Sequence, residues 1–270
     1  MALNGEDAPT EALLADRRSV RSLRIAATTK GRARDLAMAE ARGEILYFLD
    51  DDVLPPPGFP QKVAAAFAAH PEAGVIGGPN LTPPGGSALE RAQGILLASK
   101  LGAAGMSRRY RDGLPGPADE GSLILCNLGI RKQALAGLAF GDGLACGEEN
   151  LLLWRLARRG VPMRFEPALA LEHRRRATLE GFLGQVFRSG LGRMQVAWRE
   201  PGSLKMIHVL PSAGFLMALC FPGILPCYAV LALVFAAVHA EPWLALLMPA
   251  AHTAYALGFL VGVFRRGEKA

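Results

Sequence analysis

Three consecutive carboxylates, Asp50, Asp51 and Asp52, directly follow the apolar run at residues 45–49. Adjacent carboxylates repel one another, and a hard divalent cation such as Mg²⁺ or Mn²⁺ relieves that repulsion while keeping substrate phosphates in its shell. Alternate residues of an extended chain point the same way, so Asp50 and Asp52 are candidate ligands of one ion while Asp51 faces elsewhere. The structural alternative is a solvated acidic turn at the end of a strand.

A second acidic pair, Glu148 and Glu149, precedes the apolar run at residues 151–157. Acidic residues at the start of a helix interact favourably with the helix dipole, so capping explains the pair without chemistry. The functional interpretation is that one carboxylate is a general base that takes a proton from an acceptor hydroxyl. The spacing alone leaves both interpretations open.

The elements around these residues predict an α/β domain. The run 45–49 is continuously apolar, as expected of a strand buried on both faces, and residues 75–78 read as a second short strand. The alanine-rich stretches 35–41 and 61–69 predict helices between the strands. In such sheets ligands bind beyond the carboxyl ends of the strands, which is where the three aspartates stand.

The composition changes after Lys205, because almost no charged residue follows until Arg265. The uncharged stretches 208–238 and 242–264 are long enough for the roughly 20 apolar residues that a membrane-spanning helix needs. Prolines interrupt the first stretch, which predicts a kinked span or an interfacial piece followed by a span. We therefore expect a catalytic domain at 1–200 and a membrane domain with about two transmembrane helices at 201–270, the alternative being a buried soluble hairpin.

Basic residues flank both ends of this apolar region, with Arg199 and Lys205 before it and Arg265, Arg266 and Lys269 after it. By the positive-inside rule both ends face the cytoplasm. The net charge is +6, and the basic clusters lack the interleaved aromatic residues of a base-stacking surface. This pattern favours an anionic membrane or phosphorylated substrates over nucleic acid as partners.

Together these segments resemble the family-2 glycosyltransferases, whose catalytic domain has the GT-A fold, over residues 4–195. ARGEILYFLDDDVLPPPGF is similar to that family's strand with a D-x-D motif and a proline-rich turn. KGRARDLA is similar to its Gly-x-Ala-x-Arg-Asn stretch near the nucleotide. VIGGPNLTPP, CNLGIRK and GEENLLLWRLARRG resemble later family segments.

The resemblance implies roles for individual residues. Asp50 and Asp52 would hold the metal and the nucleotide diphosphate, with Asp51 beside them. Arg34 matches the arginine near the nucleotide, and Asp35 replaces the usual Asn. Asn127 is placed near the sugar or acceptor, with Arg131 nearby. Glu149 falls where the family carries its catalytic Asp, and its neighbour Glu148 is the rival for the role of base.

The chain departs from the family at two places. The family's opening strand, turn and helix find no counterpart, which leaves Asp7 and Glu6 as the candidates for the carboxylate that holds the base; loss of that central strand should expose apolar edges. Gln185 and Arg188 resemble the Gln-x-x-Arg of processive synthases, but the Trp of that motif is missing and Gly192 and Arg193 follow. The second departure favours a single-addition enzyme.

The expected protein is therefore an N-terminally incomplete GT-A-like domain followed by C-terminal transmembrane helices. It would be an inverting glycosyltransferase at the cell (inner) membrane, with its catalytic domain in the cytoplasm. Its partners would be a nucleotide-sugar donor, such as a UDP-sugar, and a lipid-linked or membrane acceptor in surface polysaccharide or glycolipid synthesis. The alternative is a truncated, catalytically inactive membrane protein that serves as an interaction partner.

Overall fold

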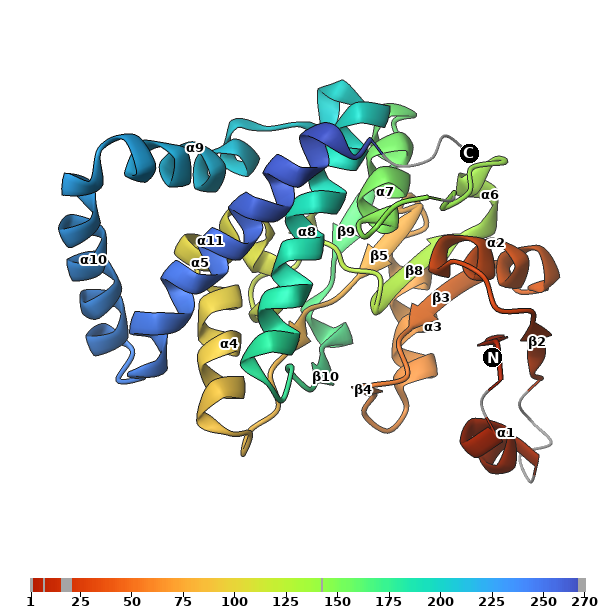
Figure 1. The fold of residues 1–270 in the computed structure, drawn as a ribbon. Coiled ribbons are helices and arrows are strands. Elements are labelled where there is room, and N and C mark those ends of the chain that lie inside the picture. The colour runs from red at the N-terminus through yellow and green to blue at the C-terminus, as the bar shows by residue number, and fades with distance from the viewer. Residues whose placement is uncertain (1, 7, 16–20, 142, 267–270) are drawn as a thin grey trace.

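The computed structural model describes residues 2–6, 8–15, 21–141 and 143–266 (Figure 1). The strands are β1 (Ala2–Asn4), β2 (Leu23–Ile25), β3 (Ile45–Leu49), β4 (Val53–Leu54), β5 (Val75–Gly77), β6 (Asn80–Leu81), β7 (Gly116–Pro117), β8 (Asn127–Arg131), β9 (Met163–Phe165) and β10 (Leu171–His173). The α-helices are α1 (Ala8–Ala15), α2 (Lys30–Glu40), α3 (Phe59–Ala69), α4 (Ala88–Ala98), α5 (Lys100–Ala103), α6 (Lys132–Leu135), α7 (Glu148–Arg158), α8 (Leu179–Arg199), α9 (Met206–Cys220), α10 (Leu225–Val238) and α11 (Trp243–Phe264). Short 3₁₀ segments are η1 (Ala104–Tyr110), η2 (Pro167–Leu169), η3 (Pro201–Ser203) and η4 (Pro222–Ile224).

A five-stranded mixed sheet forms the centre of the catalytic region, in the order β3-β8-β5-β9-β7. β8 is antiparallel to both β3 and β5, and β5 is parallel to β9. The predicted strands at 45–49 and 75–78 are confirmed as β3 and β5, and the helices expected at 35–41 and 61–69 are parts of α2 and α3. Both faces of β3 pack on apolar clusters, Leu46 and Phe48 on one and Ile45 and Tyr47 on the other, but burial is less complete than expected, because only Leu46 is buried and Leu49 is exposed.

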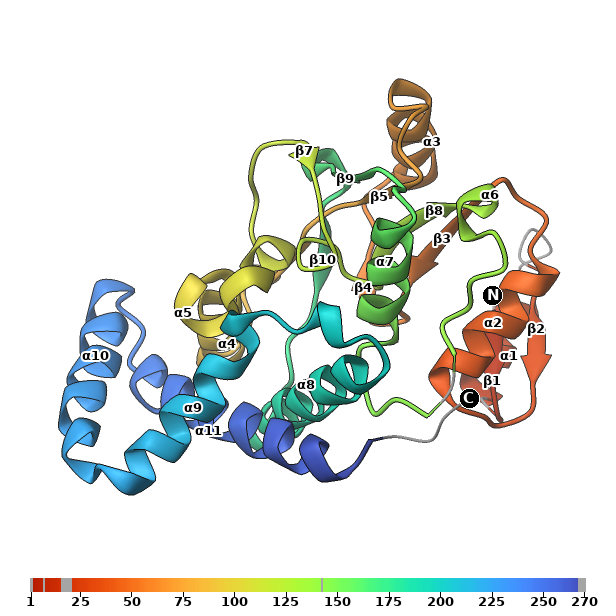
Figure 2. The same cartoon turned by 90° about the horizontal axis from the view of Figure 1, so that it is seen from above.

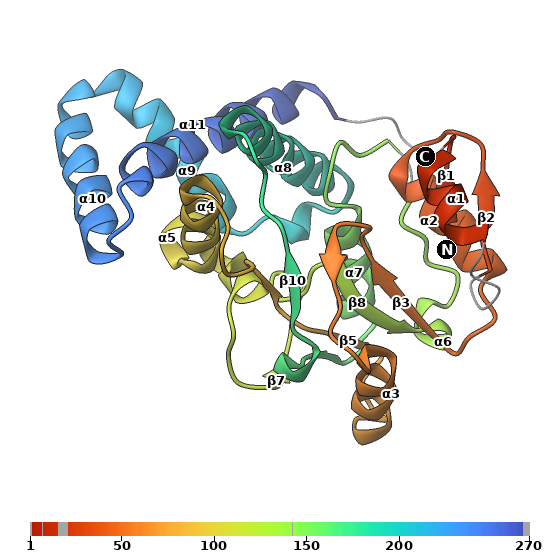
Figure 3. The ribbon, with the colours of Figure 1, turned by 90° about the horizontal axis from the view of Figure 1, so that it is seen from below.

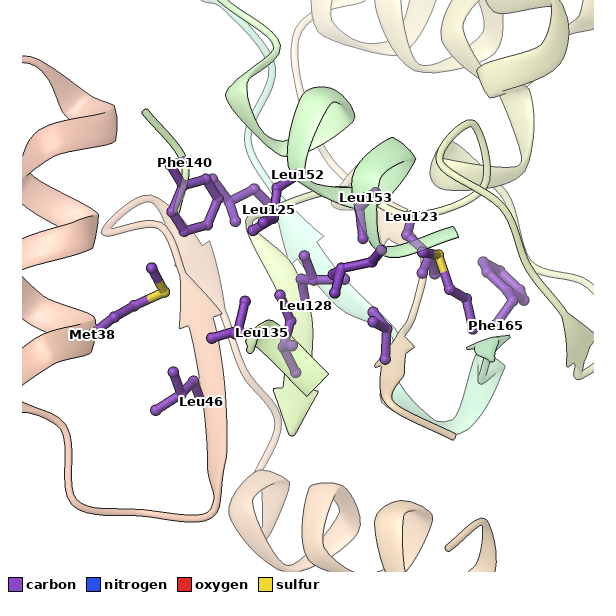
Figure 4. Packing of buried hydrophobic residues seen from close by; sticks show 14 residues of the cluster. Met38, Leu46, Leu123, Leu125, Leu128, Leu135, Phe140, Leu152, Leu153 and Phe165 are labelled. Atoms are coloured by element: carbon purple, nitrogen blue, oxygen red, sulfur yellow. The ribbon is translucent and has the colours of Figure 1, made fainter. Parts of the chain in front are cut away.

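Helices cover both faces of the sheet, and alternate side chains of each strand serve the two layers. On one face, Leu152 and Leu153 of α7 pack on Leu128 of β8 and Phe165 of β9 (Figures 2 and 4). On the other face, Phe67 of α3 packs against the sheet in a second apolar cluster. Because α7 is held by fully buried leucines, its first turn, which carries Glu148 and Glu149, has a fixed position over the sheet.

The N-terminal strands form a separate two-stranded parallel sheet, β1-β2, beyond the edge strand β3 (Figure 3). A groove of about 530 Å³ lies between β3 and this unit. Leu23 of β2 and Met38 of α2 line it on one side, and Ile45–Phe48 of β3 line it on the other. The edge strand β3 thus borders a groove, and the effect of the unmatched opening strand stays a prediction.

The apolar C-terminal region forms α9, α10 and α11, which lie at the end of the molecule opposite β1 and β2 (Figure 1). Among the described residues, α11 is the one helix that is long and apolar enough to span a membrane by itself. α9 and the η4–α10 segment pass the same test only as a pair bent by 115°. The stretch 208–238 is therefore two helices with a sharp bend, which occurs where Pro222 interrupts the helical hydrogen bonding.

α11 is docked along α8, the last long helix before the apolar region. A side chain at Gly190 of α8 would place its Cβ 2.2 Å from the carbonyl oxygen of Tyr255, and one at Gly258 of α11 would approach that of Phe187 to 2.0 Å. Glycines therefore allow the two backbones to approach closely, as in small-residue helix pairs of membrane proteins. The indole of Trp198 also donates a hydrogen bond to the carbonyl of Gly262 at 3.1 Å.

Candidate functional site

The three aspartates occupy the exposed turn between β3 and β4. β4 pairs with β10 in a small three-stranded sheet, and the register places His173 opposite Val53. This pairing brings His173 Nε2 to 2.8 Å from Asp52 Oδ1. His173 was missed by the sequence prediction, because its only signal is its place at the end of a short strand more than a hundred residues away.

The surroundings of His173 suit a metal ligand. Its Nδ1 lies 3.1 Å from Asn80 Nδ2, and its buried Nε2 makes no aligned hydrogen bond despite the short distance to Asp52. The Asn80 Oδ1 atom is also buried without a partner. A half-turn of the Asn80 amide would let Oδ1 accept from Nδ1–H, which would leave the Nε2 lone pair free for a cation.

Among the described residues, no group of three or more His, Cys, Asp or Glu side chains is arranged to enclose a metal ion. The available donors are the carboxylates of Asp50 and Asp52 and the imidazole of His173. A partial shell of this kind fits Mg²⁺ or Mn²⁺ bound together with substrate phosphates, which supply the remaining oxygen ligands. The residues present therefore fit the divalent cation that the sequence predicts.

Cations from α2 face the same aspartates. Although Asp50 reaches solvent, the protein atoms around it partly desolvate its carboxylate and raise its pKa, and the positive charges of Arg34, His173 and Lys30 act in the opposite direction. Arg34 also lies over the ring of Phe140, with its Cζ 5.8 Å from the ring centroid. The first turns of α2 thus present two basic side chains toward the aspartate turn, as a diphosphate between them would require.

The segment before α7 is fixed onto α2. Both oxygens of Asp35 accept backbone hydrogen bonds, from Phe140 N at 2.8 Å and from Gly141 N at 3.1 Å. A Cβ on Gly31 would lie only 2.0 Å from the carbonyl oxygen of Gly141. Asp35, the departure from the family pattern, thus anchors the chain that leads to Glu148 and Glu149.

The two glutamates at the start of α7 face different groups. Glu149 Oε1 lies 3.6 Å from Arg109 Nη1 and accepts a hydrogen bond from Asn150 Nδ2 at 3.3 Å. Burial raises the pKa of Glu148, which interacts with Arg34 and Lys30 of α2. Glu148 therefore faces the side of the basic helix α2, and Glu149 faces Arg109, a buried arginine that the sequence prediction did not assign a role.

The thiol of Cys126 lies close to both acidic groups. Burial raises its pKa, and the negative charges of Asp50, Asp52 and Glu149 raise it further. A thiol that resists ionisation is a poor nucleophile, so Cys126 is a structural residue. The register that pairs Leu49 with Asn127 places Cys126 beside the end of β3 where the aspartate turn begins.

Asn127 connects several segments of the protein. Its side chain is fully buried, and its amide nitrogen donates to the carbonyls of Pro79 at 3.0 Å and Leu169 at 2.7 Å. Its Oδ1 accepts from the hydroxyl of Tyr47 at 2.6 Å. These bonds use both donors and one of the two acceptor positions of the amide, and the role of Asn127 near the sugar or acceptor stays a prediction.

The guanidinium of Arg131 is likewise used within the protein, because it donates to the carbonyls of Ala73 and Phe67. Glu6 is exposed two residues after β1, and its role in binding the base of the nucleotide stays a prediction. Asp7 and Lys269 lie outside the described residues.

The family model described as glycosyl transferase family 2 matches residues 5–135. The chain is similar to the mannosyltransferase PcManGT from Pyrobaculum calidifontis, solved in complex with GDP-Man and Mn²⁺, at 18% identity and a TM-score of 0.57 over 93% of this chain and 73% of that one. It also matches S. aureus TarS residues 1–349, solved in complex with UDP-GlcNAc, at 12% identity and a TM-score of 0.49 over 94% of this chain and 78% of that one.

No curated protein matches the sequence at a significant level. At these identities the solved structures bear on the fold alone, and the family model identifies the activity class. Residues 5–135 therefore match the glycosyl transferase family 2 model, the fold is mixed α/β and GT-A-like, and the protein is a glycosyltransferase.

Proposed function

We propose that the protein transfers a sugar, with inversion, from a nucleotide sugar to an acceptor held at a membrane. The observation that carries the proposal is that two acidic groups adjoin the basic helix α2: Glu148 Cγ lies 3.7 Å from the Cβ position at Gly31, and Asp50 interacts with Arg34 and Lys30. One is the aspartate turn, with His173 beside it and the cations of α2 opposite. The other is the start of α7, with Glu149 beside Arg109.

The donor diphosphate would lie between the aspartate turn and the first turns of α2. There Lys30 and Arg34 provide positive charge, and Arg34 can form two parallel hydrogen bonds to one phosphate group. Asp50 and Asp52, with His173, would hold a divalent cation, which neutralises charge on the departing diphosphate when bound. The structure of the mannosyltransferase PcManGT, which contains Mn²⁺ and GDP-Man, supports this arrangement by analogy of fold.

Glu149 would accept the proton of the acceptor hydroxyl as its oxygen attacks the anomeric carbon of the donor sugar. The new bond forms between that oxygen and the anomeric carbon, and the bond from this carbon to the diphosphate oxygen breaks on the opposite face. Arg109 orients Glu149 through the contact at 3.6 Å. Glu148 is the rival base, since its raised pKa also suits proton transfer.

Two features support a membrane-held acceptor. α11 meets the length and composition of a spanning helix, and many large apolar side chains of α9 and α10 are exposed, including Leu219 and Val238. Contiguous exposed apolar surface of this extent marks a membrane or protein contact. We propose that α9–α11 hold the catalytic domain on the cytoplasmic face of the inner membrane, where surface glycans or glycolipids are assembled.

The donor test uses the full chain in a neutral detergent with Mn²⁺ and measures release of the nucleoside diphosphate from UDP- and GDP-sugars. The wild type is expected to hydrolyse one of these nucleotide sugars or to transfer its sugar. The sequence predicts that the donor is a UDP-sugar. Asp52→Asn should abolish this metal-dependent reaction. The matched control is Glu44→Gln, which neutralises an exposed carboxylate before the other end of β3.

Equal activity of Asp52→Asn and Glu44→Gln would remove the aspartate turn from the mechanism. A wild-type protein that neither binds nor cleaves any nucleotide sugar would favour the alternative, a catalytically inactive protein that binds a partner. The groove beside β3 would then be the candidate binding surface.

A further inference from the structure

The turn at residues 119–122 lies between the start of α7 and the start of the apolar helices. Asp119 closes this turn, because its Oδ1 accepts from the backbone nitrogen of Ser122 at 2.9 Å and from the hydroxyl of Ser122 at 2.6 Å. Glu120, the next residue, is only 4% exposed. A buried carboxylate is costly unless it is paired, so the partners of this turn need an explanation.

On one side the backbone of the turn holds Arg109, which is 3% exposed. Arg109 Nε donates to the carbonyl of Gly121 at 2.9 Å, and Nη2 donates to the carbonyl of Glu120. The same guanidinium reaches α7, where Nη2 donates to Asn150 Oδ1 at 2.5 Å and Nη1 lies 3.6 Å from Glu149 Oε1. The position of the turn therefore determines where Arg109 meets Glu149.

On the other side a single lysine binds the side chains of the turn. Lys205 Nζ lies 2.7 Å from Glu120 Oε1 and 3.4 Å from Asp119 Oδ2. The side chain of Lys205 is 45% exposed and that of Glu120 is 6% exposed, and within the described ranges no other basic side chain forms an ion pair with Glu120. An exposed pair contributes little, but a buried carboxylate that loses its cation is strongly unfavourable. Without Lys205, Glu120 would move toward water and shift the turn.

The backbone that carries Lys205 is fixed on α7, the helix that also carries Glu149. Glu200, which precedes η3, accepts a hydrogen bond at 2.9 Å from Arg155 Nε of α7. The contacts thus form a closed path from α7 through η3, Lys205 and the turn to Arg109, and back to the first turn of α7. Because packed contacts transmit displacement, a break at Lys205 reaches the other end of this path.

We propose that Lys205 is a positioning residue of the transfer reaction, which holds the 119–122 turn so that Arg109 orients Glu149. In this scheme Lys205 contacts no substrate and transfers no proton. The inference rests on the proposed role of Glu149 as the base. It also connects that role to the apolar region, because Lys205 directly precedes α9.

The test measures kcat and the donor KM of the full chain in neutral detergent with Mn²⁺, using the nucleotide sugar that the wild type cleaves. Lys205→Met should lower kcat about tenfold and leave the donor KM within about twofold, since a displacement of about 1 Å can cost up to about a hundredfold in rate. Lys205→Arg should retain most of the activity, because an arginine can still pair with Glu120. The control Lys62→Met removes an exposed lysine of α3 and should behave as wild type.

Two further measurements separate positioning from general damage. In the Glu120→Gln background the buried charge is absent, so Lys205→Met should cost little additional activity. Amide hydrogen exchange needs no turnover. In Lys205→Met it should become faster in peptides that cover residues 118–123 and 147–152, and it should stay unchanged in α3.

Unchanged kcat of Lys205→Met beside an inactive Glu149→Gln would reject the inference and leave the proposed reaction standing. The inference would also fail if Lys205→Met lost as much activity in the Glu120→Gln background as alone, or if Lys62→Met lost as much, because the ion pair would then not be the cause. Faster exchange in both peptides together with full activity of Glu149→Gln would reject Glu149 as the base, and with it the role of Lys205 in catalysis.

Discussion

Gly31 tests whether α2 positions Glu148 and Glu149, the two glutamates proposed for catalysis. A Cβ at this position would lie 2.0 Å from the carbonyl oxygen of Gly141, whereas real Cβ contacts essentially never fall under 3.0 Å. Gly31→Ala must therefore separate α2 from the segment after Phe140 by about 1 Å or more. The same segment is bonded to Asp35 and leads through Gly147 into α7.

The expected cost has two parts. Forcing one extra methyl group into close packing destabilises a protein by about 1–3 kcal/mol. A displacement of about 1 Å at a catalytic group can lower turnover about a hundredfold. Gly31→Ala should therefore fold, with a lowered melting temperature, and lose most of its transfer activity. Gly105→Ala is the control, because no atom lies within 4 Å of its added Cβ.

The assay compares turnover, donor affinity and melting temperature of the two variants with wild type. A Gly31→Ala protein with near-normal turnover would show that the chain before α7 can move without consequence, and the positioning argument would fail. Equal loss of activity in Gly105→Ala would point to a general intolerance of substitution.

Three further outcomes are expected. Glu149→Gln should bind donor but lose transfer by about 10²–10⁴-fold, and Glu148→Gln should lose much less; the reverse order in a turnover assay would move the base by one residue. Because burial raises the folded-state pKa of Asp50, its ionisation destabilises the fold as pH rises through that pKa. Asp50→Asn should therefore melt higher than wild type at neutral pH in EDTA, with the gain shrinking as pH falls toward the ordinary aspartate range; a lower melting temperature would contradict the burial argument. For topology, a cysteine at Ala240 should react with an impermeant thiol reagent outside the cell and one at Ala270 should not, and the opposite labelling would reverse the orientation.

Local pattern was enough to predict β3 and the helices on either side of it. The apolar run that ends abruptly at Asp50 has no helical periodicity, and the alanine-rich stretches of α2 and α3 have high helix propensity. Burial of β3 was predicted less well. A continuous apolar strand indicates two covered faces, but it does not reveal which neighbour lies along each edge, and here one edge borders the groove.

The partners of the site residues could not be read from local sequence. His173 reaches Asp52 only because β10 pairs with β4. Arg109 reaches Glu149 from η1, a segment that is distant from α7 in the sequence. The resemblance placed Asn127 near the sugar or acceptor, and local sequence could not show that its amide donates to the carbonyls of Pro79 and Leu169.

α8 connects the apolar helices to the catalytic groups through opposite sides of one helix. On one side Gly190 allows the backbone of α11 to approach. On the other side a Cβ at Gly192 would meet the carbonyl oxygen of Cys146 at 2.1 Å, and Gln195 Oε1 accepts from Ala145 N at 2.8 Å. These contacts hold the chain immediately before Glu148 and Glu149. Because well-packed interfaces transmit displacement instead of absorbing it, a shift of α11 against α8 reaches the first turn of α7. The apolar helices are therefore part of what positions the base, in addition to any role as an anchor.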